Sequence, residues 1–258
     1  MVMRRKSPPT TSRSKSPDLQ ATKLINTMNP QTSMNTEPRR ISLAECAEVR
    51  IGYTPSTRQP DWEFDTFGNS GTNTAPMLQP SDIDPLGGIS WDRVRRVRID
   101  GNSGYQAHEL RGDDVVLSLR GTNRAVHITF DMLQSARERT RAFGVIASSA
   151  WAVLTPHREM VQAAYLAWYF NQSPTADRLR ASQVGAVMPF LKVGTLREFE
   201  ITLPTIEAQA QIGSAHTLIN RIQQLENQRA DLCRRFLGAI VSKNVQTGTR
   251  KKYPYSGK

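Results

Sequence analysis

The feature that most constrains this fold is a proline-free stretch from residue 205 to 242. It contains only two glycines, and proline and glycine are the residues that interrupt helices most strongly. The stretch therefore predicts one long helix. Its apolar residues recur at alternating intervals of four and three, which is typical of a coiled-coil seam. The seam consists of Ala215, Leu218, Ile222, Leu225, Leu232, Phe236 and Ala239, with Arg229 as its one polar member.

A narrow apolar seam on a helix of this length needs a second helix against which to bury. We expect helix pairing, and the chain as a homodimer or paired with another protein through this helix. The residues expected to make the pair are Leu218, Ile222, Leu225, Leu232 and Phe236. The alternative is that the helix folds back on its own domain, and the sequence leaves both possibilities open.

The net charge of +11 suggests a nucleic-acid partner, but its distribution weakens that argument. Residues 1–40 carry eight Lys and Arg against two acidic residues, and residues 243–258 carry five against none. These tails account for the entire excess. Residues 41–242 hold 21 basic and 21 acidic side chains, so this part can bind DNA only through locally placed groups.

The high arginine content of residues 41–242 favours DNA binding. Of the 21 basic residues between positions 41 and 242, 20 are arginine and one is Lys192. The planar guanidinium suits bidentate contacts with phosphate oxygens and guanine edges. A coding bias toward arginine would produce the same excess, so the count alone does not decide.

Composition divides the chain into four parts. Residues 1–40 are rich in Ser, Thr, Pro and basic residues, which predicts a disordered basic arm, and residues 243–258 predict a basic disordered tail. Residues 41–204 are expected to form the folded domain, and residues 205–242 the long helix. Ser42 and Glu45 have the spacing of a capping box, which predicts a short helix near the start of the domain.

The sequence of residues 41–204 predicts an α+β fold. Extended segments rich in Val and Ile at 89–99, 113–119, 124–130 and 143–154, separated by glycine-containing turns, favour a twisted and mostly antiparallel sheet. Residues 52–90 favour an irregular, loop-rich stretch. Helices are expected at 160–171 and 174–183, the second capped by Ser173, and a strand at 199–203.

The sequence lacks the motifs of several enzyme classes. Lys192 is the only lysine between 41 and 242 and follows no glycine, which excludes a Walker A loop and a nuclease-type acid-x-Lys strand there. No G-x-S-x-G elbow and no HExxH occurs, and residues 67–71 lack the glycine spacing of a methyl-donor site. We expect no catalytic residue, no bound cofactor and no metal, although a nuclease or methyltransferase acting alone remains a third, disfavoured hypothesis.

Other chemically suggestive residues have simpler explanations. The pairs Asp82/Asp84 and Asp113/Asp114 flank turns, where aspartate commonly caps the backbone. Cys46 and Cys233 are far apart and lie in no metal-binding pattern, which predicts two reduced thiols. No apolar run approaches the roughly 18 residues of a membrane span, and no signal-peptide pattern follows the basic N-terminus, so a cytoplasmic protein is expected.

Six strings in order resemble the specificity subunits of type I restriction-modification systems and their single-domain relatives. They are GYTPS at 52–56, LQPSDI at 78–83 ahead of Gly88-Ile89, LRGDDVVLSLRG at 110–121, IASS at 146–149, YLAWYFN at 165–171 and LPTIEAQAQI at 203–212. Two departures are Thr205, where a second proline is frequent, and Ala208, which separates Glu207 from Gln209.

This resemblance implies a target-recognition domain that reads half of a split DNA site, and a spacer helix that docks a methyltransferase subunit. It also implies a half-subunit that dimerises or works alone beside its methyltransferase. A DNA adenine methyltransferase carrying S-adenosylmethionine is the expected partner, with a restriction or translocase subunit as a further candidate. The chain itself would be non-catalytic.

DNA contacts are expected from Arg, Asn and Gln side chains on turns of the sheet, because these types give bidentate contacts to guanine and adenine. The residues predicted to reach base edges or nearby phosphates are Arg58, Gln79, Arg120, Asn123 and Arg124, and those predicted to grip the backbone are Arg137, Arg139 and Arg141. The competing hypothesis is an interaction scaffold without DNA binding, in which the long helix recruits partners and the domain reads a protein surface.

Overall fold

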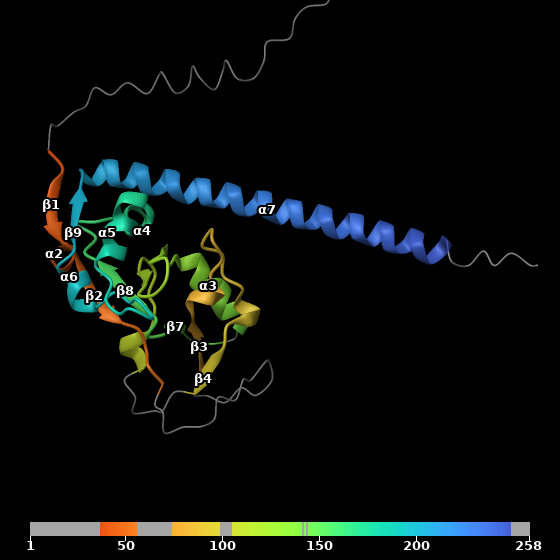
Figure 1. The fold of residues 1–258 in the computed structure, drawn as a ribbon, viewed down its shortest axis with the longest axis horizontal. Helices are drawn as coiled ribbons and strands as arrows, with labels where there is room; N and C mark the ends of the chain where they lie inside the picture. The colour runs from red at the N-terminus through yellow and green to blue at the C-terminus, as the bar shows by residue number, and fades with distance from the viewer. Residues whose placement is uncertain (1–36, 56–73, 99–104, 141, 143, 249–258) are drawn as a thin grey trace, which may run out of the picture. The chain divides into compact units, whose positions relative to one another are not determined.

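The computed structural model describes residues 37–55, 74–98, 105–140, 142 and 144–248 (Figure 1). The fold is α+β, as expected, with mostly antiparallel strands and a long C-terminal helix. The folded part before that helix, the described part of residues 39–203, is called the body below. Most of the expected basic arm, residues 1–36, lies outside the described residues, as do 249–258 of the expected tail.

The centre of the body is a four-stranded antiparallel sheet. Its order is β2 (Ala47–Ile51), β8 (Trp151–Pro156), β5 (Val115–Ser118) and β6 (Ala125–His127). The Val- and Ile-rich segments expected to be extended supply β5, β6 and most of β8, whereas β2 lies before all of them. In β5 all four residues are buried, which places the strand between two apolar layers.

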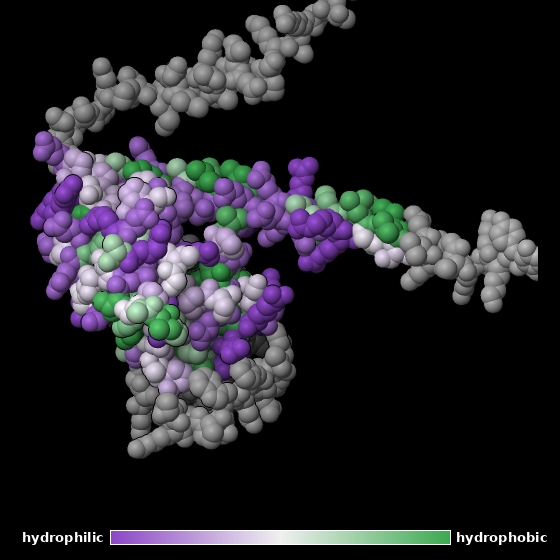
Figure 2. Space-filling model, in the orientation of Figure 1, coloured by the Kyte–Doolittle hydropathy of each residue, from purple (hydrophilic) through white to green (hydrophobic). Residues whose placement is uncertain are grey.

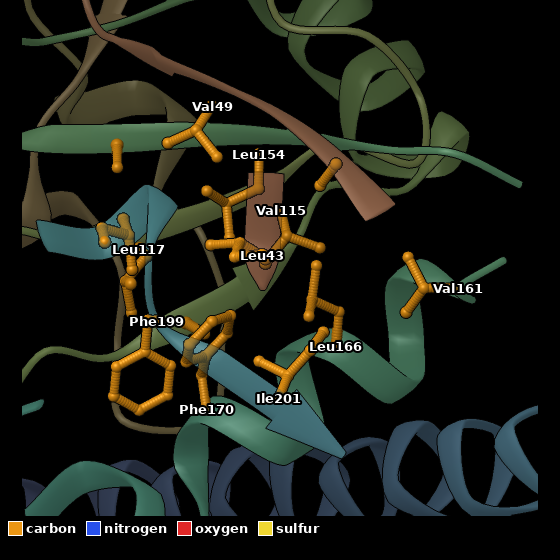
Figure 3. Close-up of a cluster of buried hydrophobic side chains, with 14 of the residues drawn as sticks. Leu43, Val49, Val115, Leu117, Leu154, Val161, Leu166, Phe170, Phe199 and Ile201 are labelled. Carbon is orange, nitrogen blue, oxygen red and sulfur yellow. The ribbon is translucent and has the colours of Figure 1, made fainter. Parts of the chain in front are cut away.

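Alternate side chains of β5 and β8 enter two separate cores. Val115, Leu117 and Leu154 face a larger core, part of which is shown in Figure 3, while Val116 and Val153 belong to the second. Since successive strand residues point to opposite faces, this alternation is what a sheet covered on both sides requires. The larger core also contains Leu43, Val49, Val161, Leu166, Phe170, Phe199 and Ile201.

A smaller three-stranded sheet lies beside the second core. Its order is β4 (Arg96–Arg98), β3 (Thr74–Leu78) and β7 (Ile146–Ala147), and the β3–β7 pair is parallel. Between 89 and 99 the expected extended segment is only partly a strand. A 3-10 helix, η2 (Trp91–Arg93), precedes β4, because the Trp91 indole turns into the second core.

Other short elements connect these sheets. The 3-10 turn η1 (Pro80–Asp82) lies in the expected loop-rich stretch at 52–90, and a second 3-10 turn, η3 (Tyr105–His108), lies after β4. Helix α3 (Phe130–Thr140) was not expected from the sequence. It buries only Leu133 and Ala136, so its apolar pattern is too sparse to stand out among Arg, Glu and Gln residues.

The expected capping box is present at the start of the body. The backbone N–H of Ser42 donates to Glu45 Oε1 at 3.1 Å and its hydroxyl donates to the same oxygen at 2.8 Å, which opens α2 (Leu43–Cys46). These bonds hold the pKa of Glu45 below its ordinary value. Strand β1 (Arg39–Ser42) precedes it and pairs with β9 (Glu200–Leu203), so the strand that enters the body lies beside the strand that leads into the long helix.

The helices of the C-terminal half follow the expected order with shifted ends. Helix α4 (Ala163–Asn171) begins three residues later than expected, and α5 (Ser173–Ala181) takes Gln172 rather than Ser173 as its N-cap. A short helix that was not expected, α6 (Val193–Arg197), buries Leu196 against the larger core. Helix α7 (Ile206–Gly248) runs six residues past the expected end at 242.

The aspartate pairs act in turns and ion pairs, as the simpler explanation predicted. Asp114 is fully buried and accepts hydrogen bonds from Arg50 at 3.1 Å, the Arg111 N–H at 2.9 Å and the Thr155 hydroxyl at 2.6 Å. Asp84 accepts from the Gly88 N–H at 2.9 Å. In the part of the chain that the structure describes, no three His, Cys, Asp or Glu residues gather as metal ligands.

Candidate nucleic-acid and helix-pairing surfaces

The apolar seam of α7 is exposed. Of its five expected pairing residues, Leu218, Ile222, Leu225, Leu232 and Phe236 have 61, 47, 48, 65 and 68% of their surface exposed. Figure 2 shows apolar patches along α7 on the face in view. A row of large apolar side chains that are about half or more exposed to solvent indicates an interaction surface.

The opposite side of α7 faces the body. Half-buried residues recur along the helix at His216, Asn220, Gln224 and Asp231, and Gln224 Nε2 donates to the carbonyl oxygen of Leu86 at 3.0 Å. At 100° per residue, these positions lie across the helix from the seam. The helix therefore turns a polar face toward its own body, and in this structure the seam is not used to fold back.

A cleft of about 1460 Å³ lies between this polar face and the body. Its walls include residues 84–93, the inner face of α3 and the polar side of α7. His216 lies in it, with Nε2 3.1 Å from the Asn220 amide nitrogen, and burial holds the pKa of His216 below its ordinary value. The polar side chains of α7 line this cleft, so the helix faces the body there without burying its apolar seam.

Arg120 and Asn123 lie in the same turn after β5 but have different surroundings. Arg120 is exposed, with its backbone bridged to Phe190. Asn123 is 1% exposed, adopts φ +50°, and donates from its amide to the carbonyl of Ser118 at 2.8 Å while accepting from Gln183 at 2.6 Å. Asn123 thus holds the turn together, and its side chain presents no surface to a base edge here.

Arg124 and Gln79 are also tied to the body. Arg124 Nη1 donates to the carbonyl oxygen of Asp84 at 2.7 Å and lines the cleft. Gln79 is half-buried at the start of η1, where its backbone N–H donates to Asp82 at 2.8 Å. Burial raises the pKa of the Asp82 carboxyl, an effect that this hydrogen bond partly offsets. The Arg124 side chain and the Gln79 backbone therefore both take part in hydrogen bonds within the body.

The predicted backbone-gripping residues Arg137 and Arg139 are exposed in the last turn of α3. Arg139 is 3.4 Å from Asp92 of η2, with more than half of each side chain exposed, so the pair is weak and readily exchanged for a phosphate. Arg58 and Arg141 lie outside the described residues.

Sequence reasoning missed two basic residues beside α3. Arg93 and Arg95 are exposed on and just after η2, which packs against α3. Together with Arg137 and Arg139 they form a group called the α3 arginine cluster below. The signal in the sequence was the arginine-rich run from Arg93 to Arg98, in which four of six residues are arginine.

The strings that carried the family resemblance pack against one another. The Gly52 N–H donates to Trp151 O at 3.0 Å, and the Tyr53 N–H donates to Ala147 O at 2.7 Å. A Cβ on Gly52 would lie 2.1 Å from the carbonyl oxygen of Ser148, so only glycine fits there. These contacts show that the strings build part of the scaffold of the body.

No family model and no curated protein matches the chain. Three solved structures to which it is similar come from type I restriction-modification systems. One is the HsdS subunit of Thermoanaerobacter tengcongensis, at 17% identity and a TM-score of 0.45, covering 84% of this chain and 44% of that one.

The second is a chain from a study of complex assembly and conformational transition of the type I system, at 17% identity and a TM-score of 0.47, covering 89% and 49%. The third is the S subunit from M. genitalium, at 11% identity and a TM-score of 0.45, covering 78% and 43%. The chain spans a little under half the length of each. No helix among the described residues is long and apolar enough to cross a membrane.

Proposed function

We propose that this chain is a DNA sequence-specificity subunit of a type I-like restriction-modification complex. The domain at residues 41–204, which the body represents, reads one DNA half-site, and α7 docks a second recognition unit and a DNA adenine methyltransferase. The chain is non-catalytic, the methyltransferase carries S-adenosylmethionine, and a translocase subunit completes the restriction complex. The basic tails, including residues 1–40, add phosphate affinity that does not depend on base sequence.

The observation that carries this proposal is the exposed seam of α7. Leu225 and Phe236 lie on the side of the helix that faces away from the body, so pairing leaves the body free for another ligand. A single recognition domain with an unpaired seam fits a half-subunit that becomes complete by pairing. The ordered strings of the specificity-subunit family lead directly into this helix and support the same assignment.

The proposal that the body binds DNA rests on its exposed arginines. In the α3 arginine cluster, Arg93, Arg137 and Arg139 are exposed on two elements in contact, η2 and α3, and Arg95 is exposed just after η2. Exposed guanidinium groups suit contacts with phosphate oxygens. Arg120 is exposed on a separate turn and is the candidate for a base edge, since bidentate arginine contacts select guanine.

Selection from a random duplex library by the full-length chain tests the proposal. Wild type is expected to enrich one motif, with affinity that falls steeply as salt is added. Arg120→Ala should relax the preference at one defined base. Arg139→Ala should weaken binding to all duplexes about equally and reduce the salt slope by about 1.

Arg180→Ala is a matched control, because the Arg180 side chain is 58% exposed on α5 and is paired with an exposed aspartate, as Arg139 is, but does not belong to the α3 arginine cluster. It should change neither the motif nor the salt slope. If wild type enriches no motif over random duplex, the interaction scaffold replaces DNA reading as the function. Turnover by the isolated chain with magnesium or a methyl donor would contradict the non-catalytic role.

A further inference from the structure

The attachment of α7 to the body depends on a buried glutamine. Gln209 is 1% exposed. Its Nε2 donates to the carbonyl oxygens of Pro204 at 3.0 Å and Met160 at 3.2 Å, and its Oε1 accepts from the Gln162 N–H at 3.0 Å. These bonds connect the first turn of α7 to the chain just before α7 and to the start of α4.

One turn further on, Gly213 lets α7 cross α4 closely. A Cβ at this position would lie 2.8 Å from Ala164 Cβ and 2.9 Å from the backbone nitrogen of Tyr165. Carbon atoms normally approach to about 3.5–4.0 Å, so any side chain here pushes the two helices apart. Tyr165 is itself fixed, since its hydroxyl donates to Thr202 O at 2.6 Å.

Beyond this crossing, α7 faces the body across the polar cleft. Its described contacts there include the Gln224 to Leu86 hydrogen bond, which water can replace at little cost. Ile212, by contrast, packs against the larger core. The direction of α7 is therefore decided by the crossing at Gln209 and Gly213.

Small changes at the crossing become large at the far end of α7. Four residues of helix separate Gln209 from Gly213, or about 6 Å, so moving Gly213 outward by about 1 Å tilts the helix by about 10°. Phe236 lies about 40 Å beyond Gln209 along the helix and would move by about 7 Å. In DNA that distance corresponds to about two base pairs at about 3.4 Å each.

We propose that Gly213, with Gln209, is a positioning residue that fixes the exit angle of α7 and thereby the number of base pairs between the two half-sites. The second part rests on the proposed function, in which α7 joins two recognition units. Gly213 itself touches no DNA. A structural role alone would change stability, whereas this role changes the spacing between half-sites and leaves each half-site sequence intact.

The exit angle of α7 can be tested without DNA, through a distance between α7 and the body. In the full-length chain, spin labels on the exposed native Cys233 and on Gln134→Cys of α3 report the distance between α7 and the body, while buried Cys46 stays unlabelled. Labelled chain is diluted into excess unlabelled chain, so that each distance is measured within one molecule. Gly213→Ala should shift the distance by several ångströms.

Two further variants make the comparison specific. Gly238→Ala is the matched control, since a Cβ there meets nothing within 4 Å and both substitutions raise helix propensity. It should leave the distance unchanged. Ala164→Gly combined with Gly213→Ala removes the nearer clash and should restore part of the wild-type distance.

Motif selection with the same variants tests the consequence for DNA. Gly213→Ala should enrich the wild-type half-site with a changed spacer length, and Gly238→Ala should enrich the wild-type motif. An unchanged label distance in Gly213→Ala overturns the proposal. A changed distance with an unchanged spacer overturns its DNA part. If wild type enriches no motif, the proposed function fails together with that part, and the distance alone decides whether Gly213 sets the angle.

Discussion

At the scale of single residues, the buried carboxylate of Asp114 connects several strands of the body. It accepts from Arg50 of β2 and Thr155 of β8, and Arg50 also donates to the Glu109 carbonyl at 2.9 Å. Because Asp114 is fully buried, replacing it leaves partners without an acceptor where little water can reach them.

Asp114→Ala is therefore expected to lower the free energy of unfolding by about 3 kcal/mol, the cost of breaking a buried ion pair by removing one partner. Urea unfolding followed by circular dichroism measures this change. Asp177→Ala removes an exposed ion pair with Arg180 and should cost less than about 1 kcal/mol. Equal losses in the two variants would show that Asp114 is no more important than a surface carboxylate.

The two cysteines differ in reactivity for a physical reason. Burial raises the pKa of the Cys46 thiol to about 11, whereas Cys233 is exposed on α7. Only the thiolate is reactive. A thiol reagent at a pH of about 8 should modify Cys233 quickly in the native protein and Cys46 only after denaturation. Mass spectrometry counts the modified groups, and rapid double labelling of folded protein would contradict the buried position of Cys46.

The residue types in the sequence indicated which side chains could contact DNA, but not which of them are exposed to solvent and able to do so. Arg120 and Asn123 lie three positions apart, yet the first is exposed and the second holds the turn through Ser118 and Gln183. Gln183 is 60 residues away from Asn123. Contacts over such separations depend on how the helices return to the sheet, which no local pattern contains.

At the scale of elements, α7 was predictable and α3 was not. The seam of α7 repeats over many turns, so its periodicity is clear in the sequence. The direction of α7 relative to the body became known only from the crossing with α4. Helix α3 has 11 residues and buries two of them. A short helix with so few apolar residues is stabilised by its neighbours, and its sequence carries little signal of its own.

The seam gives a prediction about self-association. Leu225→Glu places a charge in the middle of the exposed apolar row and should weaken pairing of the full-length chain at least tenfold, or about 1.4 kcal/mol. Sedimentation velocity at several concentrations measures the effect, with circular dichroism confirming that the body stays folded.

Gln223→Glu provides the control, since it adds the same charge at an exposed position of α7 outside the seam. It should leave pairing unchanged. A wild-type chain that stays monomeric at every concentration would contradict self-pairing, and the seam would then belong to another protein. Equal weakening by both variants would show that charge alone, and not the apolar row, controls association.

At the scale of the whole molecule, His216 makes the cleft between α7 and the body sensitive to pH. Burial lowers its pKa below the ordinary value of 6.5, so the unfolded chain takes up the proton before the folded chain does. Stability associated with neutral His216 is therefore present above pH 6.5 and declines as the pH falls below that value.

His216→Gln should remove this part of the pH dependence. Urea unfolding at a pH of about 7.5 and of about 6 is expected to show a larger loss of stability in wild type than in the variant. His127 differs in that its Nε2 lies 3.1 Å from Asp113 Oδ1, so His127→Gln is the comparison at a histidine outside this burial. Identical pH profiles for wild type and His216→Gln would exclude the contribution of the cleft.

The sequence by itself determined the long helix with its seam, the α+β class and the turns capped by aspartate, because these depend on periodicity and on local backbone chemistry. The tertiary structure decided that the seam faces away from the body, that Arg93 lies on a 3-10 helix packed against α3, and that Asn123 is buried. Those outcomes depend on contacts between residues far apart in the chain. The close crossing at Gly213 is the plainest case, since its glycine is conspicuous in the sequence but its reason lies in α4.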